Sequence, residues 1–235
     1  MRYWPFWKND LQGKFNQLKV KICGLSTPKD VSTAIEAGAD LVGFVFFPKS
    51  PRNISLERAS SLSSLVPSNV KKVVLVVNPE DFFLEKIMTA VNPDMIQLHG
   101  HEKVSRVSEI RDLFNLPIMK AVGIRNRNDL GVLNEYSHVA DQLLVDAKPV
   151  ETNSLPGGNG IAFDWKLISE FDWELPWMLA GGLNSSNVAT AVKLTNAKQV
   201  DVSSGVEKSP GIKDPEAIRK FITAAKANDN GPESD

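Results

Sequence analysis

Thiol and imidazole groups are scarce in this sequence, whose 235 residues include one cysteine, Cys23, and three histidines. A lone cysteine cannot form a disulfide within the chain, so the protein needs no oxidising compartment, which favours a cytoplasmic location. His99 and His101 lie close together, but so few cysteines and histidines leave little material for a zinc site. The sequence therefore predicts neither a disulfide nor a metal centre.

An excess of charge of one sign is also absent, because 27 Lys and Arg residues nearly balance 28 Asp and Glu residues. This balance creates no long-range field toward nucleic acid or an anionic membrane, so neither partner is predicted. No apolar run reaches the roughly 18 residues of a membrane span. The aromatic start MRYWPFWKND is interrupted by Lys8, Asn9 and Asp10 too early for the core of a signal peptide. Any anionic ligand must therefore bind at a local site.

Short apolar runs rich in β-branched residues, in contrast, recur along the chain. They predict eight strands, near residues 20–24, 40–46, 71–77, 95–99, 117–123, 142–147, 177–181 and 199–204. The strand starts lie about 20 to 35 residues apart, which is the spacing of βα units rather than of hairpins. Eight such units predict an α/β fold, a single-domain (βα)8 TIM barrel, with a doubly wound open sheet as the alternative.

Helix-capping residues stand between these runs and mark where helices should begin. Side chains of Ser, Thr and Asp can accept hydrogen bonds from first-turn N–H groups, and proline fits the first turn. Gly38 suits the C-terminal cap of the first helix. The predicted starts are Thr27-Pro28, Ser55, Asn78-Pro79-Glu80 and Asp214-Pro215-Glu216.

Three further regions flank or interrupt the predicted barrel of residues 20–227. Residues 1–19 form an N-terminal extension, interpreted as an accessory arm whose aromatic residues pack on the outside or the bottom of the barrel. Residues 228–235 form a polar tail that is predicted to be disordered. The longest connection, residues 148–160, contains LPGGNG and is a candidate mobile active-site loop.

Polar residues share one face in four of the predicted strands. The sets are Lys21 with Cys23, Gln97 with His99, Asp146 beside Leu144, and Asp201 with Ser203. The outward face of a barrel packs on helices and should be apolar, so these polar residues should point inward. They lie near the C-terminal ends of their strands, where such barrels carry the active site.

Two of these residues have both a catalytic and a structural interpretation. Cys23 is either a small buried hydrophobe or a thiolate acting as general base or nucleophile, and Lys21 would lower its pKa. Asp146 is either a general acid, or a helix cap or ion-pair partner of Lys148. His99 is interpreted as a hydrogen-bonding wall of the pocket.

Glycines and serines after the last two predicted strands indicate a phosphate site. Gly181 and Gly182 follow the seventh strand, and Ser203, Ser204 and Gly205 follow the eighth. Backbone N–H groups in such loops approach phosphate oxygens closely, so a phosphorylated small molecule is the predicted partner. Arg52, after the second strand, is either a bidentate clamp for a carboxylate or a solvated surface residue.

Seven motifs, in the same order, make the chain resemble the phosphoribosylanthranilate isomerase family from about residue 19 to residue 225. They are KICGLSTPKD (21–30), AGADLVGFVFFPKSPRNIS (37–55), QLHGHE (97–102), LLVDAKP (143–149), GGNGIAFDW (157–165), AGGLNSSNV (180–188) and VDVSSGVEKSPGIKDPEAI (200–218). The combination of KICGL, KSPR and SSGVE with PGIKD is highly specific. Departures from the family pattern are the N-terminal extension, Asn159, where the family more often has Thr, and the loop 148–156.

The resemblance implies a barrel that rearranges N-(5-phosphoribosyl)anthranilate to 1-(2-carboxyphenylamino)-1-deoxyribulose 5-phosphate in tryptophan biosynthesis. It implies Cys23 as the general base and Asp146 as the general acid. Arg52 would lie near the anthranilate end and Asp201 near the sugar hydroxyls, and Lys21 and His99 are further predicted substrate contacts. The anthranilate nitrogen acts as the electron sink, so no cofactor or metal is expected.

Two other functions stay open on the sequence. One is another barrel enzyme, such as the histidine-pathway sugar isomerase, which would have an aspartate in place of Cys23, or a pentose-phosphate epimerase, which needs metal ligands. The other is a barrel that binds a phosphoribosyl compound without catalysis, which fold alone does not exclude. The oligomeric state is predicted as a monomer or a weak homodimer.

Overall fold

The computed structural model describes residues 17–148 and 163–227. Three predicted regions lie largely or wholly outside these residues: most of the N-terminal extension, most of the 148–160 loop with Asn159, and the whole tail of residues 228–235. The predictions made for those three regions therefore stay predictions.

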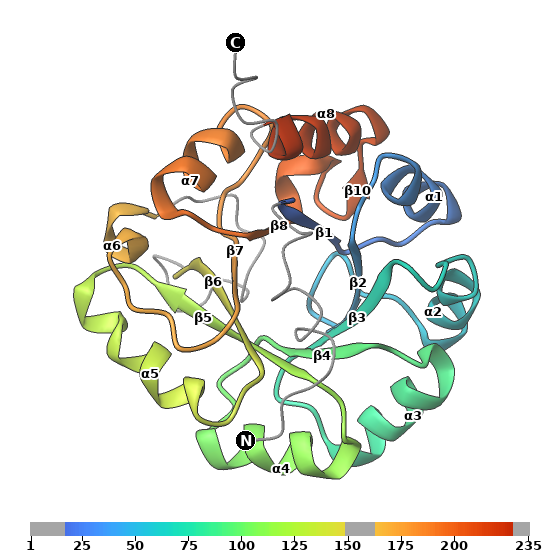
Figure 1. Cartoon of the computed structure of the whole chain (residues 1–235). Coiled ribbons are helices and arrows are strands. Elements are labelled where there is room, and N and C mark those ends of the chain that lie inside the picture. The colour runs from blue at the N-terminus through green and yellow to red at the C-terminus, as the bar shows by residue number, and fades with distance from the viewer. Residues whose placement is uncertain (1–16, 149–162, 228–235) are drawn as a thin grey trace.

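Eight parallel strands close into one barrel, in which each strand pairs with the next and β8 pairs with β1. Figure 1 shows the strands in the centre and the helices in a ring around them. The strands are β1 (Lys19–Cys23), β2 (Leu41–Phe46), β3 (Lys71–Val76), β4 (Met95–Leu98), β5 (Ile118–Ile124), β6 (Gln142–Ala147), β7 (Trp177–Leu179) and β8 (Gln199–Val202). All eight strand predictions and the (βα)8 barrel are confirmed, and the open-sheet alternative is wrong.

Helices of 4 to 12 residues follow the strands in the described part of the chain. They are α1 (Pro28–Glu36), α2 (Leu56–Ser63), α3 (Asp81–Val91), α4 (Val104–Phe114), α5 (Gly131–Ser137), α6 (Lys166–Ser169), α7 (Val188–Thr195) and α8 (Pro215–Lys226). Short 3-10 helices, η2 (Arg127–Asp129) and η3 (Ser204–Val206), and a hairpin of β9 (Glu207–Ser209) and β10 (Ile212–Lys213) complete the described elements. Across residues 17–148 and 163–227, no helix combines the length and apolar character that crossing a bilayer requires.

The capping residues begin helices where the sequence predicts them. Thr27 accepts a hydrogen bond from the Asp30 N–H and Asp30 accepts one from the Thr27 N–H, a reciprocal capping box that starts α1. Ser55 and Asp214 cap α2 and α8 through one side-chain oxygen each, which accepts from the Arg58 and Glu216 N–H respectively. α3 follows the predicted start at Glu80 without a side-chain cap. Gly38 follows α1 with a φ of +95°, a left-handed conformation that glycine adopts without strain.

Alternation along the strands separates the inside of the barrel from its outer wall. The inner cluster fills the barrel with side chains from every second strand position: Leu41, Val73, Met95, Met119, Ala121, Leu144, Met178 and Ala180. The larger cluster lies between the strands and the helices and holds residues such as Val42, Val74 and Ile96. The predicted inward polar residues share the inner face, so the alternation argument is confirmed.

Lys120 in β5 is an exception to the expectation that the outward face is apolar. It lies between the inward residues Met119 and Ala121, and it is buried. Its Nζ lies 2.9 Å from Glu102 Oε2 and donates to the Gly100 carbonyl at 2.8 Å. The expectation fails here because a buried ion pair, completed by backbone oxygens, satisfies the charge and ties the β4–α4 connection to the barrel wall.

Candidate active site

The polar residues that sequence alternation placed inward meet at one end of the barrel. Cys23 is the last residue of β1, Asp146 lies next to the end of β6, and His99 directly follows β4. Asp201 lies in β8, which pairs with β1. All eight barrel strands run parallel, so residues at the ends of these strands lie at the same, C-terminal rim.

Lys21 brings a positive charge into the interior of the barrel. Its side chain is fully buried, and its Nζ lies 2.9 Å from Asp201 Oδ1 on the neighbouring strand. Burial lowers the pKa of Lys21, but Asp201 and Cys23 raise it, and the result lies above the ordinary value of 10.5. Lys21 is therefore a permanent cation at neutral pH, placed directly beneath the rim.

Cys23 lies between an apolar wall and this charged group. Val45 and Leu75 pack beside its sulfur, and Gly43 on the next strand leaves space for it, because a Cβ there would lie 2.9 Å from Sγ. Burial raises the pKa of the Cys23 thiol above 9.0, although Lys21 and Lys213 lower it. Lys21 therefore lowers the pKa of this thiol as predicted, but burial and the Asp201 charge outweigh both cations.

Asp146 lies at the centre of a chain of hydrogen-bonding side chains. Its Oδ1 accepts from the Ala147 N–H at 2.7 Å, and its Oδ2 lies 3.4 Å from His99 Nε2. Gln97 Nε2 lies 2.9 Å from His99 Nδ1, and the amide N–H donates to this ring nitrogen in the tautomer that carries the ring proton on Nε2, facing the carboxylate. Lys148 pairs with Asp129 instead, so the predicted alternative of an Asp146–Lys148 ion pair is wrong.

Arg52 is not the solvated surface residue that the sequence left open as an alternative. Only 8% of the residue is exposed, and its Nε and Nη2 donate to the two carboxylate oxygens of Glu207 at 2.7 and 2.8 Å. Gly24, with a φ of +77°, makes room for it, because a Cβ there would lie 2.7 Å from Arg52 Cδ. Arg52 is thus held at the rim in a fixed orientation by a bidentate pair.

Glu207 and Lys213 are rim residues to which the sequence gave no role. Lys213 Nζ lies 2.7 Å from Glu207 Oε1 and donates to the Ser203 carbonyl at 2.9 Å. Burial raises the pKa of Glu207, but Arg52 and Lys213 lower it to below its ordinary value of 4.5. Burial lowers the pKa of Lys213 below 10.5, and Glu207 raises it only in part. Opposite charges on either side of Gly211, just after the predicted phosphate loop, were the only sign of this pair in the sequence.

The two glycine-containing loops predicted to bind phosphate lie against each other. A Cβ at Gly205 would lie 1.9 Å from the Leu183 carbonyl oxygen, so the turn after β8 touches the loop after β7. Gly181 and Gly182 both have positive φ, and a Cβ at Gly181 would lie 3.1 Å from Asp146 Oδ1. Only glycine allows this approach, which places the loop after β7 beside the carboxylate.

Ser203 and Ser204 connect this loop pair to the first strand. Ser203 Oγ donates to the Cys23 carbonyl at 3.1 Å, and Ser204 begins η3. The structure thus brings every predicted rim residue into one of three connected groups, around Cys23, Asp146 and Arg52. In the described ranges, no three His, Cys, Asp or Glu side chains are grouped so that they could hold a metal ion.

Comparison with known families and proteins finds consistent similarity over most of the chain. A family model described as N-(5'phosphoribosyl)anthranilate (PRA) isomerase matches residues 20–224. An N-(5'-phosphoribosyl)anthranilate isomerase of Cereibacter sphaeroides is 53% identical over 209 residues, which cover 89% of this chain and 99% of the relative. One of Paracoccus denitrificans is 51% identical over 210 residues, with 89% and 98% covered.

Solved structures agree with these sequence matches. A phosphoribosyl anthranilate isomerase from Thermotoga maritima superposes with a TM-score of 0.81 at 38% identity, and the match covers 89% of this chain and 99% of that one. A second isomerase structure, in complex with reduced 1-(o-carboxyphenylamino)-1-deoxyribulose 5-phosphate, superposes with a TM-score of 0.76 at 37% identity and the same coverage.

Proposed function

The chain belongs to the N-(5'-phosphoribosyl)anthranilate isomerase family of tryptophan biosynthesis, and we propose that Cys23 and Asp146 perform its acid–base chemistry. The substrate is N-(5-phosphoribosyl)anthranilate and the product is 1-(2-carboxyphenylamino)-1-deoxyribulose 5-phosphate. The observation that carries the assignment of residues is that a thiol and a carboxyl group, on β1 and β6, lie at one rim of a closed barrel.

Asp146 acts first in this proposal, as the general acid. It protonates the furanose ring oxygen, and the ring opens to a Schiff base. The Gln97–His99 pair orients the carboxyl group, because the imidazole lies between Gln97 Nε2 and Asp146 Oδ2. Gly181 lets the loop after β7 approach the carboxyl group closely, since a Cβ there would lie 2.6 Å from Ala147 N and 3.1 Å from Asp146 Oδ1.

Cys23 acts second, as the general base that removes the C2′ proton and leaves an enolamine, which tautomerises to the ketone. Its thiol is held protonated by burial in the free protein, so the thiolate must be stabilised as it forms. Lys21 and Lys213 are the two neighbouring cations that lower the pKa of this thiol. We assign them the role of compensating the negative charge on sulfur.

The ends of the substrate have separate binding groups in this proposal. The touching loops that carry Gly181, Gly182 and residues 203–205 hold the phosphate, and Arg52 faces the anthranilate carboxylate. Asp201 contacts the sugar hydroxyls. Fixing both ends places C2′ and the ring oxygen between base and acid, which makes proton transfer effectively intramolecular.

The nitrogen of anthranilate supplies the electron sink, so this mechanism requires no metal ion or organic cofactor. We further propose that the protein acts in the cytoplasm on this small molecule, without a nucleic-acid or membrane partner, as a monomer or a weak homodimer.

Steady-state turnover of freshly generated phosphoribosylanthranilate by the full chain tests the proposal. Cys23→Ser and Asp146→Asn should each lower kcat by about 100-fold or more while substrate still binds, because neither replacement can transfer the required proton. Asp172→Asn, a change of the same kind at an exposed position, should leave kcat unchanged. Near-wild-type turnover in either rim variant would remove that residue from the mechanism, and an inactive wild-type chain would refute the activity itself.

A further inference from the structure

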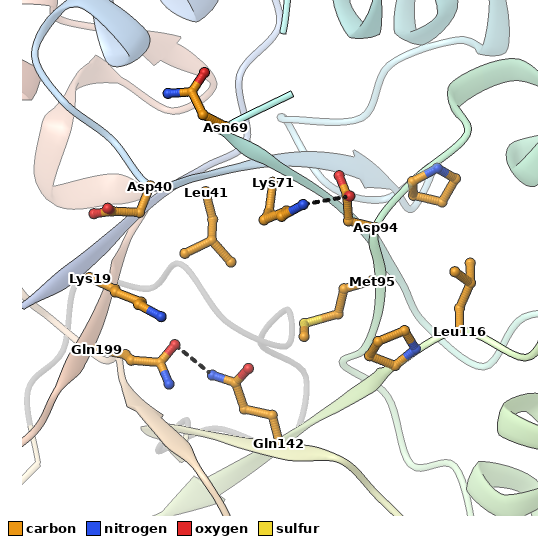
Figure 2. Close-up of a pocket in the computed structure, with 12 residues that line it drawn as sticks. Lys19, Asp40, Leu41, Asn69, Lys71, Asp94, Met95, Leu116, Gln142 and Gln199 are labelled. Atoms are coloured by element: carbon orange, nitrogen blue, oxygen red, sulfur yellow. Dashed lines mark hydrogen bonds and ion pairs between the residues drawn. The ribbon is translucent and has the colours of Figure 1, made fainter. Parts of the chain in front are cut away.

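A cavity of about 280 Å³ opens at the end of the barrel opposite to Cys23 and Asp146. The first residues of six strands line it, so it is the N-terminal mouth of the barrel, as Figure 2 shows. Leu41 and Met95 form its apolar floor, and the side-chain amides of Gln142 and Gln199 form one wall. None of these residues belongs to the candidate active site, so the cavity needs a separate explanation.

The amide of Gln142 is incompletely hydrogen-bonded. The residue is fully buried, and its Nε2 donates to Gln199 Oε1 at 3.1 Å. Within residues 17–148 and 163–227 its own Oε1 has no hydrogen-bond partner, and Figure 2 shows this oxygen pointing toward the middle of the lining residues. Buried amide oxygens in proteins nearly always accept a hydrogen bond, so the cavity is built for a group that carries a donor.

The chain itself reaches the barrel at this cavity. Lys19 is the first residue of β1 and lines the cavity, so only Gln17 and Leu18 separate the cavity from residues 1–16. That segment, MRYWPFWKNDLQGKFN, carries five aromatic side chains in 16 residues. Trp4 and Trp7 each combine a large apolar ring with one N–H donor, which matches an apolar floor beside a lone acceptor. The family match begins at residue 20, so this segment is a feature outside the shared barrel.

We propose that the N-terminal mouth of the barrel binds an indole side chain, Trp4 or Trp7, of this chain's own N-terminal segment, whose N–H donates to Gln142 Oε1. Residues 8–18 connect Trp7 to the cavity residue Lys19, and this tether keeps the segment at a high effective concentration near the cavity, which favours it over a ligand from solution. The docked ring covers Leu41 and Met95 and satisfies the unpaired amide oxygen. The inference is independent of the proposed function, because the cavity and the catalytic rim lie at opposite ends.

Methionine-methyl NMR on the full chain tests this contact directly. With ¹³C-methyl methionine, the Met95 methyl should show nuclear Overhauser effects to the protons of one indole ring and a ring-current shift. The variant that removes the docked indole, Trp4→Leu or Trp7→Leu, should abolish both the nuclear Overhauser effects and the ring-current shift. The Met119 and Met178 methyls lie inside the same barrel but do not line the cavity, so they should not change.

Three outcomes of this experiment overturn the proposal. The first is a Met95 methyl without contact to any indole and unaffected by both Trp variants. The second is a contact that weakens on dilution, because it would show that the segment comes from a second copy. The third is a contact from Trp165, Trp173 or Trp177, because these residues belong to the barrel itself.

Limited trypsin cleavage after Lys8 provides a second measurement that does not depend on NMR. Met95→Trp fills the cavity and should speed this cleavage at least about tenfold, because a tethered site of high effective concentration protects the segment. Leu113→Trp makes a comparable change on the exposed face of α4 and should leave the rate unchanged. Equal rates in the wild type and both variants would overturn the proposal.

Discussion

The two ends of the barrel bury polar groups in different ways. At the C-terminal rim the buried groups are mostly charged and lie in pairs, as Lys21 does with Asp201 and Arg52 with Glu207. At the N-terminal mouth the buried polar groups are the neutral amides of Gln142 and Gln199. The charges there, such as Lys71 with Asp94, are partly exposed. Charge is therefore concentrated where a phosphorylated, carboxylated substrate would bind.

This difference predicts unequal consequences for equivalent substitutions. A buried charge that loses its partner keeps its full desolvation penalty, so breaking such a pair is strongly destabilising. A neutral amide has a smaller penalty, and a water molecule or a nearby donor can replace its partner. Substitutions at the rim should thus change stability and activity together, whereas those at the mouth should change stability alone, and by less.

Replacing Lys21 with methionine should have the largest effect. Lys21→Met keeps the length of the side chain but leaves the Asp201 carboxylate buried without its cation. The free energy of unfolding should fall by about 3–5 kcal/mol, as for other broken buried ion pairs. Chemical denaturation at pH 7 measures it. The double variant Lys21→Met/Asp201→Leu should recover part of the loss, and the absence of any recovery would show that the pair itself is not responsible.

Glu207→Gln should have the next largest effect, because it removes the anion shared by Arg52 and Lys213. Loss of these charge-assisted hydrogen bonds should reduce the free energy of unfolding by about 2 kcal/mol at pH 7. The pKa of Glu207 is lower in the folded protein than its ordinary 4.5, so its stabilisation is complete above that pH. The stabilisation is lost as pH falls through the lower folded value.

The pH dependence separates this electrostatic effect from lost packing. Thermal or denaturant unfolding of the wild type and Glu207→Gln should differ most near pH 7 and converge as the pH falls below 4.5 and through the lower folded pKa of Glu207. A constant difference down to pH 3 would show that the carboxylate charge is not what stabilises the rim. Glu85→Gln, at an exposed position within α3, serves as the control with little effect at any pH.

Local features of the sequence were sufficient for the fold. Each strand is a short β-branched run, and caps such as Thr27 and Ser55 start helices by hydrogen bonds to residues three positions away. The inward face followed from alternation, which correctly put Lys21, Cys23 and Asp146 at one end of the barrel. These predictions succeed because each depends on neighbours within one turn or one strand.

The failures all involve partners that are distant in the chain. Arg52 and Glu207 are 155 positions apart, so no local pattern pairs them. Lys120 is buried on the outer wall only because Glu102 reaches it from the β4–α4 connection. The net rise in the pKa of Cys23 was not predicted, because the burial that causes it depends on Val45 and other residues from neighbouring strands. Burial and pairing are properties of the closed barrel rather than of any segment.

Gln97 offers a test of positioning within the rim, with an effect near tenfold. Gln97→Met removes the donor to His99 Nδ1, so kcat should fall moderately as the ring loses its fixed orientation. Gln97→Glu resembles the native side chain more closely, but its carboxylate accepts from Nδ1–H and turns the Nε2 lone pair toward Asp146. The Gln97→Glu variant should therefore have a lower kcat than the Gln97→Met variant, by about tenfold, which corresponds to ~1.4 kcal/mol in activation free energy.

Steady-state kinetics of the two Gln97 variants, with thermal unfolding to confirm that both are folded, measures this order. If Gln97→Met lowers kcat as much as Gln97→Glu does, or more, then Gln97 acts by filling space rather than by fixing the tautomer of His99. His101→Gln, at an exposed position nearby, should change kcat in neither direction.

Gln142→Met at the opposite end of the barrel should have the smallest effect of this series. It removes the unpaired Oε1, which favours folding, but also removes the donor to Gln199 Oε1, which opposes it. The two contributions should largely cancel, so the free energy of unfolding should change by no more than about 1 kcal/mol, with kcat unchanged.

If an indole donates to Gln142 Oε1, the substitution also loses that hydrogen bond, and this additional loss of stability should disappear in the Trp4→Leu/Trp7→Leu background. A double-mutant cycle in the free energy of unfolding therefore isolates the contact, because residues that do not touch give a coupling near zero. A loss as large as that of Lys21→Met would contradict the contrast between the two ends, since it would make a neutral amide as consequential as a paired charge.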